Sequence, residues 1–101
     1  MNIITITGAT KKQNTTTAYT TYIVTSNMPM LKISTKATLK GHKGFSSTVL
    51  PYKSPSKYGG GIYSTYTGSK KYFSVKLDSQ VTTQLGTKST GSSAGGVTLG
   101  K

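Results

Sequence analysis

The sequence lacks cysteine, arginine, tryptophan and glutamate, and Asp78 is its one acidic residue. Without cysteine there is no disulfide bond, thiolate nucleophile or cysteine metal site. Without arginine there is no planar guanidinium to read guanine or to grip one phosphate through two hydrogen bonds. Any contact with nucleic acid is therefore expected to be independent of base sequence.

The positive charge comes entirely from lysine. The 101 residues include 13 lysines, and the formal net charge is +12 at pH 7. Ion pairs inside the chain cannot balance these ammonium groups, which must be solvated or matched by carboxylates or phosphates of another molecule. Such a charge attracts polyanions and anionic membrane surfaces. The alternative is a basic surface that only keeps the protein in solution.

Length and composition predict one small domain with a thin core. Hydrophobic residues make up 33% of the chain, so burial offsets the chain entropy only modestly and a neighbouring subunit would add stability. No stretch approaches the roughly 20 apolar residues of a membrane span. Residues 1–7 lack the basic region and long apolar run of a signal peptide, and we expect them to form a first strand.

An alternation of apolar and polar residues predicts a half-buried strand over residues 31–40. One face carries Leu31, Ile33, Thr35, Ala37 and Leu39. The other face carries Lys32, Ser34, Lys36, Thr38 and Lys40. The lysines Lys32, Lys36 and Lys40 would then form an outward row with a spacing of about 13 Å, which suits loose charge neutralisation.

A second alternating segment covers residues 71–78. Phe73, Val75 and Leu77 point one way, and Tyr72, Ser74, Lys76 and Asp78 the other. The β-prone run 62–67 precedes it, and the short connection 68–70 contains glycine, so we expect residues 62–78 to form a hairpin.

Further strands are expected at residues 18–25, 46–50 and 81–85, with a turn at 40–44 and a loop at 51–61 that contains three consecutive glycines. Good helix formers are scarce. The fold class predicted is all-β, a small antiparallel sandwich or open barrel of about six or seven short strands, with an extended Gly/Ser-rich C-terminal arm.

Residues 1–85 are expected to form the single β domain and residues 86–101 the arm. The composition of 86–96 is that of a flexible linker. The β-prone tip that follows could add to the edge of a neighbouring sheet, and its assembly residues would be Val97 and Leu99.

The sequence favours a protein that is not an enzyme and binds no metal, cofactor or small-molecule substrate. Glycoside chemistry needs two carboxylates, and only Asp78 is present. His42 lies between glycine and lysine in an expected turn, and one histidine with one aspartate cannot complete a metal site within a subunit. Residues 59–61 are not followed by the Gly-Lys-Ser/Thr of a phosphate-binding loop.

Lysines and tyrosines alternate in the middle of the chain. We predict polyanion contacts by Lys32, Lys36, Lys40, Lys53, Lys57, Lys70, Lys71 and Lys76. Tyrosine rings can stack on unpaired bases, and the candidates are Tyr58, Tyr63, Tyr66 and Tyr72. The structural alternative is that these tyrosines are half-buried strand residues with solvated hydroxyls.

These observations favour a structural subunit of a larger assembly, such as a small virion or capsid-associated protein located in the virion. Its lysine-rich face would meet nucleic acid, an anionic membrane or acidic partner subunits, and its other partners would be copies of itself or other subunits. The alternative is a free-standing protein that binds single-stranded nucleic acid without sequence preference.

Overall fold

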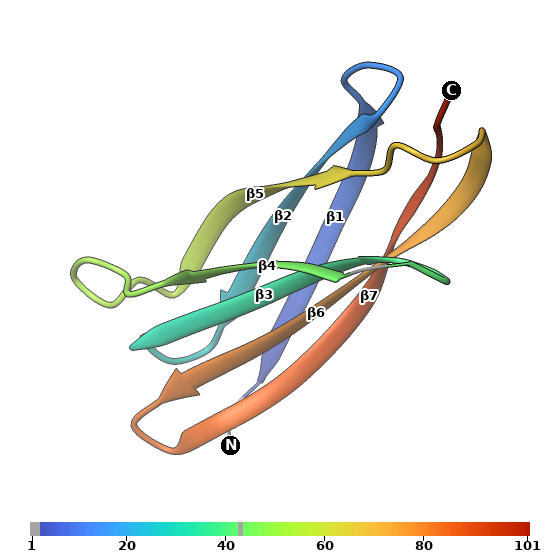
Figure 1. Cartoon of the computed structure of the whole chain (residues 1–101). Coiled ribbons are helices and arrows are strands. Elements are labelled where there is room, and N and C mark those ends of the chain that lie inside the picture. Colours follow the sequence, from blue (N-terminus) through green and yellow to red (C-terminus); the bar gives the residue numbers. More distant parts are fainter. Residues whose placement is uncertain (1–2, 43) are drawn as a thin grey trace.

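The chain forms β-strands along most of its length. The computed structural model describes residues 3–42 and 44–101, which contain seven strands and no helix (Figure 1). The strands are β1 (Ile4–Lys12), β2 (Thr17–Ser26), β3 (Lys32–Leu39), β4 (Gly44–Val49), β5 (Lys57–Thr65), β6 (Lys71–Thr83) and β7 (Gly86–Leu99). Abundant β-branched threonine favours this conformation. The all-β prediction is confirmed.

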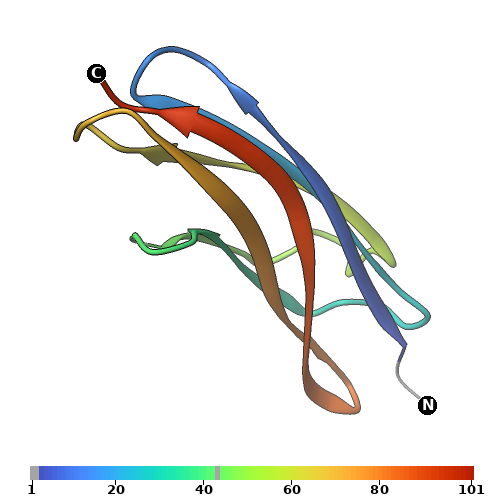
Figure 2. The ribbon, with the colours of Figure 1, turned by 90° about the vertical axis from the view of Figure 1, so that its right-hand side faces the viewer.

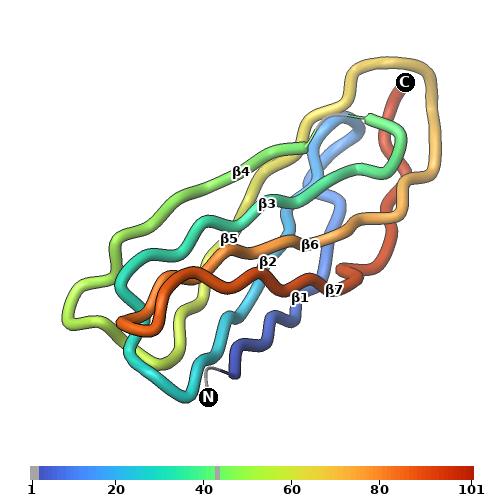
Figure 3. Tube along the Cα trace, turned by 90° about the horizontal axis from the view of Figure 1, so that it is seen from below, coloured from blue at the N-terminus to red at the C-terminus, as the bar shows by residue number. Residues whose placement is uncertain are grey.

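The strands form two antiparallel sheets that pack as a sandwich (Figures 1 and 3). Sheet A has the order β1-β2-β5 and sheet B the order β4-β3-β6-β7. The chain passes between the sheets through segments 27–31, 50–56 and 66–70. The molecule is elongated, with extents of 46 × 21 × 17 Å, and β1 of sheet A runs beside β7 of sheet B (Figure 2).

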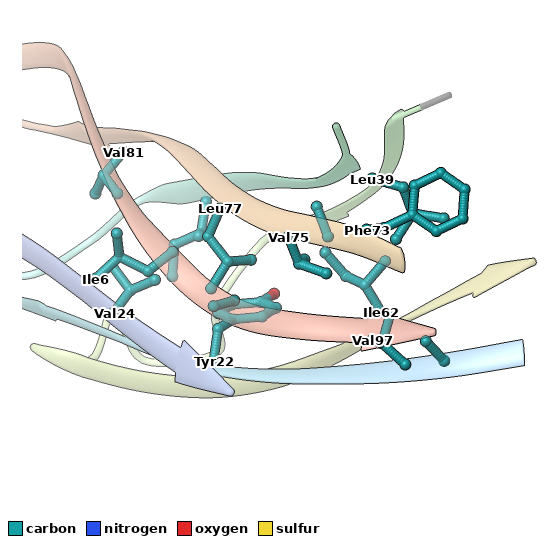
Figure 4. Close-up of a cluster of buried hydrophobic side chains, with 14 of the residues drawn as sticks. Ile6, Tyr22, Val24, Leu39, Ile62, Phe73, Val75, Leu77, Val81 and Val97 are labelled. Carbon is teal, nitrogen blue, oxygen red and sulfur yellow. The ribbon is translucent and has the colours of Figure 1, made fainter. Parts of the chain in front are cut away.

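The core lies between the sheets, because alternate residues of each strand point inward. Figure 4 shows side chains of sheet A, such as Ile6 and Val24, facing side chains of sheet B, such as Leu77 and Val81. Each fully buried aliphatic side chain contributes roughly 1.5–3 kcal/mol relative to an exposed one. Hydrophobic contact between the two sheets therefore holds the sandwich together.

The two alternating segments have the predicted faces. Ile33, Thr35, Ala37 and Leu39 of β3 are buried, as are Phe73, Val75 and Leu77 of β6. Leu31 is an exception, since it precedes β3 and its exposed fraction is 47%. The turn expected after β3 is present in residues 40–42, while Lys43 lies outside the described residues.

The predicted hairpin over residues 62–78 is wrong. β5 belongs to sheet A and pairs with β2, whereas β6 belongs to sheet B and pairs with β3 and β7. Segment 66–70 crosses between the sheets, and the ring of Tyr66 packs edge-on against Phe73 with 4.8 Å between ring centroids. This packing draws the connection over the end of the core.

The extended C-terminal arm is not confirmed. Residues 86–99 form β7, which pairs with β6 of the same chain, and Val97 and Leu99 are buried in the core of that chain. β6 continues through Thr83, so residues 81–85 are not a separate strand, and Gln84 and Leu85 form the turn to β7. The predicted assembly residues are thus used within the subunit.

The predicted loop at 51–61 is shorter than expected, because β5 begins at Lys57 and contains all three glycines. Tyrosines of β2 cover two of them: the Tyr22 ring lies against Gly60 and the Tyr19 ring against Gly61. An aromatic ring laid across a strand glycine supplies the packing that the glycine lacks. This cover explains how a Gly-Gly-Gly run can form a strand.

Backbone hydrogen bonds fix the end of the chain. The amide of Gly100 donates to the carbonyl of Thr15 at 2.8 Å, and the amide of Lys101 donates to the carbonyl of Gly68 at 3.0 Å. Gly100 has a φ of 110°, and a Cβ there would lie 2.7 Å from the Gly68 carbonyl oxygen. Glycine is therefore required where β7 meets the loops of both sheets.

Candidate polyanion-binding surface

The outer surface of sheet B carries a row of lysines, which we call the lysine face. It consists of Lys32, Lys36, Lys40 and Lys76. The first three follow β3, with Lys40 just beyond its end, and Lys76 lies opposite Thr38 on β6. The period of two in both strands puts their lysines on one side of the sheet. The predicted outward row on β3 is thus extended by a fourth lysine on β6.

Asp78 lies within the lysine face. It is opposite Lys36 in the register of β3 and β6, and its Oδ1 is 3.8 Å from Nζ of Lys76. The Lys76 and Asp78 side chains are 69% and 50% exposed, so this ion pair contributes little to stability. Its main effect is to offset part of the positive potential at the centre of the face.

Two shallow hollows run along the lysine face over β6 and β7 and share Lys76 and Gly91. Their volumes are about 600 and 580 Å³. The first is bordered by the ammonium-bearing side chains of Lys40 and Lys76 and by the hydroxyl-bearing residues Ser74, Ser92 and Ser93. Ammonium and hydroxyl groups together suit the oxygens of a phosphate or sulfate group.

A β-bulge shapes the first hollow. Ser74 pairs with Gly96 and Lys76 with Ser93, so β7 has one extra residue at this point. Gly95 within the bulge has a φ of 81°. A bulge bends its strand and redirects neighbouring side chains. The bulge lies beside Lys76, so the bend in β7 is at the border of the first hollow.

One end of the sandwich adds a second group of lysines, which we call the lysine end. It consists of Lys11, Lys12, Lys40, Lys70, Lys71 and Lys101. Backbone hydrogen bonds join the β1–β2 loop, segment 66–70 and the C-terminal residue at the upper left of Figure 2, and the end of β3 reaches the same end of the sandwich below them. Lys40 belongs to both groups, so the lysine face continues into the lysine end.

Sequence reasoning missed three members of the lysine end, namely Lys11, Lys12 and Lys101. The adjacent pair at residues 11 and 12 was a local signal of positive charge. Only the fold brings it near Lys70 and Lys101, through the hydrogen bonds that hold residues 100 and 101 between the loops of the two sheets.

Two predicted polyanion contacts lie away from both groups. Lys53 is in segment 50–56 at the opposite end, with its ammonium 5.5 Å from the centre of the Tyr52 ring. Lys57 begins β5 in sheet A. Lys71 is at the lysine end, where its ammonium lies 5.5 Å from the centre of the Phe73 ring.

The four candidate stacking tyrosines are scattered over the molecule. Tyr58 and Tyr66 are half-buried and pack against the core. Tyr63 lies on the outer surface of sheet A, 4.5 Å from Tyr19 between ring centroids. Tyr72, with an exposed fraction of 64%, lies on the outer surface of sheet B. Tyr72 alone of the four shares a surface with the lysine face.

The outer surface of sheet A contrasts with that of sheet B, and we call it the uncharged face. It consists of Thr5, Thr7, Ala9, Tyr19, Thr21, Ile23, Thr25, Gly59, Gly61, Tyr63 and Thr65. Lys11 and Lys57 extend these rows at opposite corners. The fold thus separates a charged sheet surface from one made of hydroxyl, glycine, aliphatic and aromatic groups.

No model of a known protein family matches the chain, and no curated protein matches it. In the described part of the chain, no three histidine, cysteine, aspartate or glutamate side chains are grouped so that they could hold a metal ion. Across residues 3–42 and 44–101, no helix is long and apolar enough to cross a membrane. The two sheet surfaces and the lysine end are therefore the features of the molecule that bear on function.

Proposed function

We propose that the chain is a non-enzymatic structural subunit of a larger assembly and that its lysine face neutralises nucleic acid without reading its sequence. The observation that carries this proposal is the separation of charge: Lys32, Lys36, Lys40 and Lys76 share one sheet surface, while the described part of the opposite sheet surface has lysines only at two corners. A subunit needs one surface for its cargo and another for its neighbours.

The charge and spacing of the lysines support loose neutralisation. Lysine presents a mobile point charge, and a spacing of about 13 Å along β3 is wider than that of adjacent phosphates. The hydroxyl groups of Ser74, Ser92 and Ser93 beside Lys76 offer additional hydrogen-bond partners for phosphate oxygens. The second hollow is less favourable to an anion, because Asp78 borders it. Each contact then adds affinity and carries no information about the bases.

A small virion or capsid-associated protein is the kind of subunit that we favour. A chain with one acidic residue and a net charge of +12 lacks internal counter-charges, and packaged nucleic acid would provide them. The C-terminal strand is part of its own subunit and lends no support to assembly. The assembly proposal rests instead on the charge separation and the open outer surface of sheet A.

The salt dependence of oligonucleotide binding tests the role of the lysine face. Engagement of its lysines gives a log–log slope of about −0.7 per neutralised phosphate for a single strand. We expect the triple variant Lys32→Gln, Lys36→Gln, Lys76→Gln to bind more weakly and to flatten the slope by about 2. The control replaces Lys53 and Lys57 with glutamine, and its change in slope for each lysine removed should be much smaller. Equal effects of the two variants would refute the proposal.

A free-standing binder of single strands is the second candidate, and the position of Tyr72 favours it. This exposed ring lies on the same sheet surface as the lysines, where it could stack on an unpaired base. Tyr72→Ser should then weaken single-strand binding by about tenfold and leave duplex binding unchanged. Tyr63→Ser is the control, because Tyr63 lies on the opposite sheet surface. An equal loss for duplex and single strand would reject stacking by Tyr72.

A further inference from the structure

We infer that the uncharged face is a self-association surface and that its occupant is a second copy of this chain. This inference rests on the proposed function, because the pairing of two copies would serve to build an assembly. The pairing itself does not require that the lysine face bind nucleic acid. Two copies would pair through sheet A, with both lysine faces pointing outward.

Charge restricts where two copies can meet. Each chain carries a net charge of +12, so contacts through the lysine face or the lysine end bring like charges together. The uncharged face has lysines only at two corners, Lys11 and Lys57, among the residues that the structure describes. Of the two sheet surfaces, it is the one on which contact with an identical copy brings the fewest like charges together.

Distance also weakens the repulsion in such a pair. Packed sheets lie about 10 Å apart, so the two lysine faces would be separated by three sheet spacings, about 30 Å. The Debye length is about 8 Å at physiological ionic strength and about 30 Å at 0.01 M. The pair is therefore expected to form at physiological or higher salt and to dissociate at low salt, opposite to the salt response of nucleic-acid binding.

The shape of the uncharged face is self-complementary. A shallow hollow of about 630 Å³ is lined by Ala9, Thr21, Ile23 and the glycines of β5. Beside it Tyr63 projects with an exposed fraction of 61% and is braced by Tyr19. A two-fold axis crossing β5 near Gly61 would place Tyr63 of each copy against the hollow of the other, as a two-fold interface requires.

The composition of the face suits a modest interface. Ile23 is 43% exposed and lies at the hollow, and the aromatic pair Tyr19 and Tyr63 lies two same-face positions farther along the strands. Aliphatic and aromatic groups interspersed with threonine hydroxyls suit a protein interface, with Lys11 beside Tyr19 at one corner. Three strands about 30 Å long span a strip about 15 Å wide, which is at the low end for specific interfaces. We expect a weak dimer that forms at on the order of 10–100 µM protein.

Sedimentation equilibrium of the full chain tests this inference, with far-UV circular dichroism to verify folding. The wild type should dimerise at about 0.5 M NaCl and be monomeric at about 0.01 M NaCl. Ile23→Lys and Thr21→Lys each place a charge in the hollow and should weaken dimerisation by at least about tenfold. Ser46→Lys adds the same charge to the outer surface of sheet B and should leave dimerisation unchanged. If Ile23→Lys fails to fold, the dimerisation of Thr21→Lys tests the inference in its place.

Two results would overturn the inference: a wild type that stays monomeric at about 1 mM protein in high salt, or a dimer that resists both lysine substitutions on sheet A. The failure of the proposed function is separable, because nucleic-acid binding is measured at low salt on the monomer. The Ile23→Lys monomer should retain oligonucleotide binding whether or not the wild type pairs.

Discussion

Gly8 of β1 faces Leu77 of β6 across the core. The Leu77 side chain occupies the space that a side chain at residue 8 would need. A Cβ at residue 8 would lie 2.5 Å from the carbonyl oxygen of Thr21 and still closer to Cδ1 of Leu77. The Thr21 carbonyl oxygen belongs to the backbone, so it cannot move away by a side-chain rotation. The thin core is closed at this point by contact between a leucine and a strand backbone.

Gly8→Ala is therefore expected to destabilise the protein by about 1–3 kcal/mol, because the added methyl group forces the sheets apart or Leu77 out of its position. Urea unfolding followed by circular dichroism measures the change. Gly59→Ala is the matched control, since a Cβ there would meet its nearest neighbour, the Tyr22 carbonyl oxygen, at an ordinary 3.8 Å. Equal losses for both alanine variants would contradict this account of the packing.

Two buried serines should respond in opposite directions to replacement by alanine. The Ser64 hydroxyl has no hydrogen-bond partner among the described residues, whereas the Ser79 hydroxyl is 3.1 Å from that of Thr35. Ser64→Ala should be neutral or should stabilise the fold by up to about 1 kcal/mol. Ser79→Ala leaves Thr35 unpaired and should cost about 1–3 kcal/mol. Thermal unfolding of the two variants checks the difference, and a loss of stability in Ser64→Ala would be inconsistent with it.

Leu99 should be as important to stability as a leucine in the middle of the core. It is fully buried near the end of β7, so Leu99→Ala is expected to lower the free energy of unfolding by about 2–5 kcal/mol. Leu85→Ala provides the control, because Leu85 lies in the β6–β7 turn and is 62% exposed. If Leu99→Ala had no more effect than Leu85→Ala, residues 86–99 would be an independent arm after all.

Asp78 should weaken the binding of anions at the lysine face. Asp78→Asn removes the one acidic side chain, which is 3.8 Å from the Lys76 ammonium, and should raise oligonucleotide affinity by about two- to fivefold at low salt. Its effect on stability should be small, since both partners are exposed. Gln80→Asn, an uncharged change on the same strand, should leave affinity unchanged. Fluorescence anisotropy measures both, and unchanged affinity in Asp78→Asn would argue against binding at this surface.

The faces of β3 and β6 could be predicted from the sequence because strand geometry fixes the period of two. Lys32 and Lys36 could be placed outward for the same reason. The partners of these strands could not be predicted, because a short glycine-containing connection serves equally for a hairpin and for a crossing between sheets. The packing of Tyr66 on Phe73, a tertiary contact, accompanies the crossing in segment 66–70.

β7 and the lysine end could not be predicted from the sequence, for a related reason. Residues 86–96 have no alternating apolar pattern, and they form a strand because β6 offers a long partner edge in the same sheet. Ala94 and Val97 are the inward contacts that anchor it. Lys11 and Lys101 are at the same end of the sandwich only because of the topology, which no local pattern of either segment contains.

The reactivity of each lysine toward acetylation, measured by mass spectrometry with and without a single-stranded oligonucleotide, tests the central claim most directly. At about 0.05 M NaCl we expect strong protection of Lys32, Lys36, Lys40 and Lys76, released when the salt is raised to about 0.5 M. Lys53 and Lys57 should stay reactive throughout. Uniform protection of all lysines, or protection greatest at Lys53 and Lys57, would contradict the assignment of the lysine face.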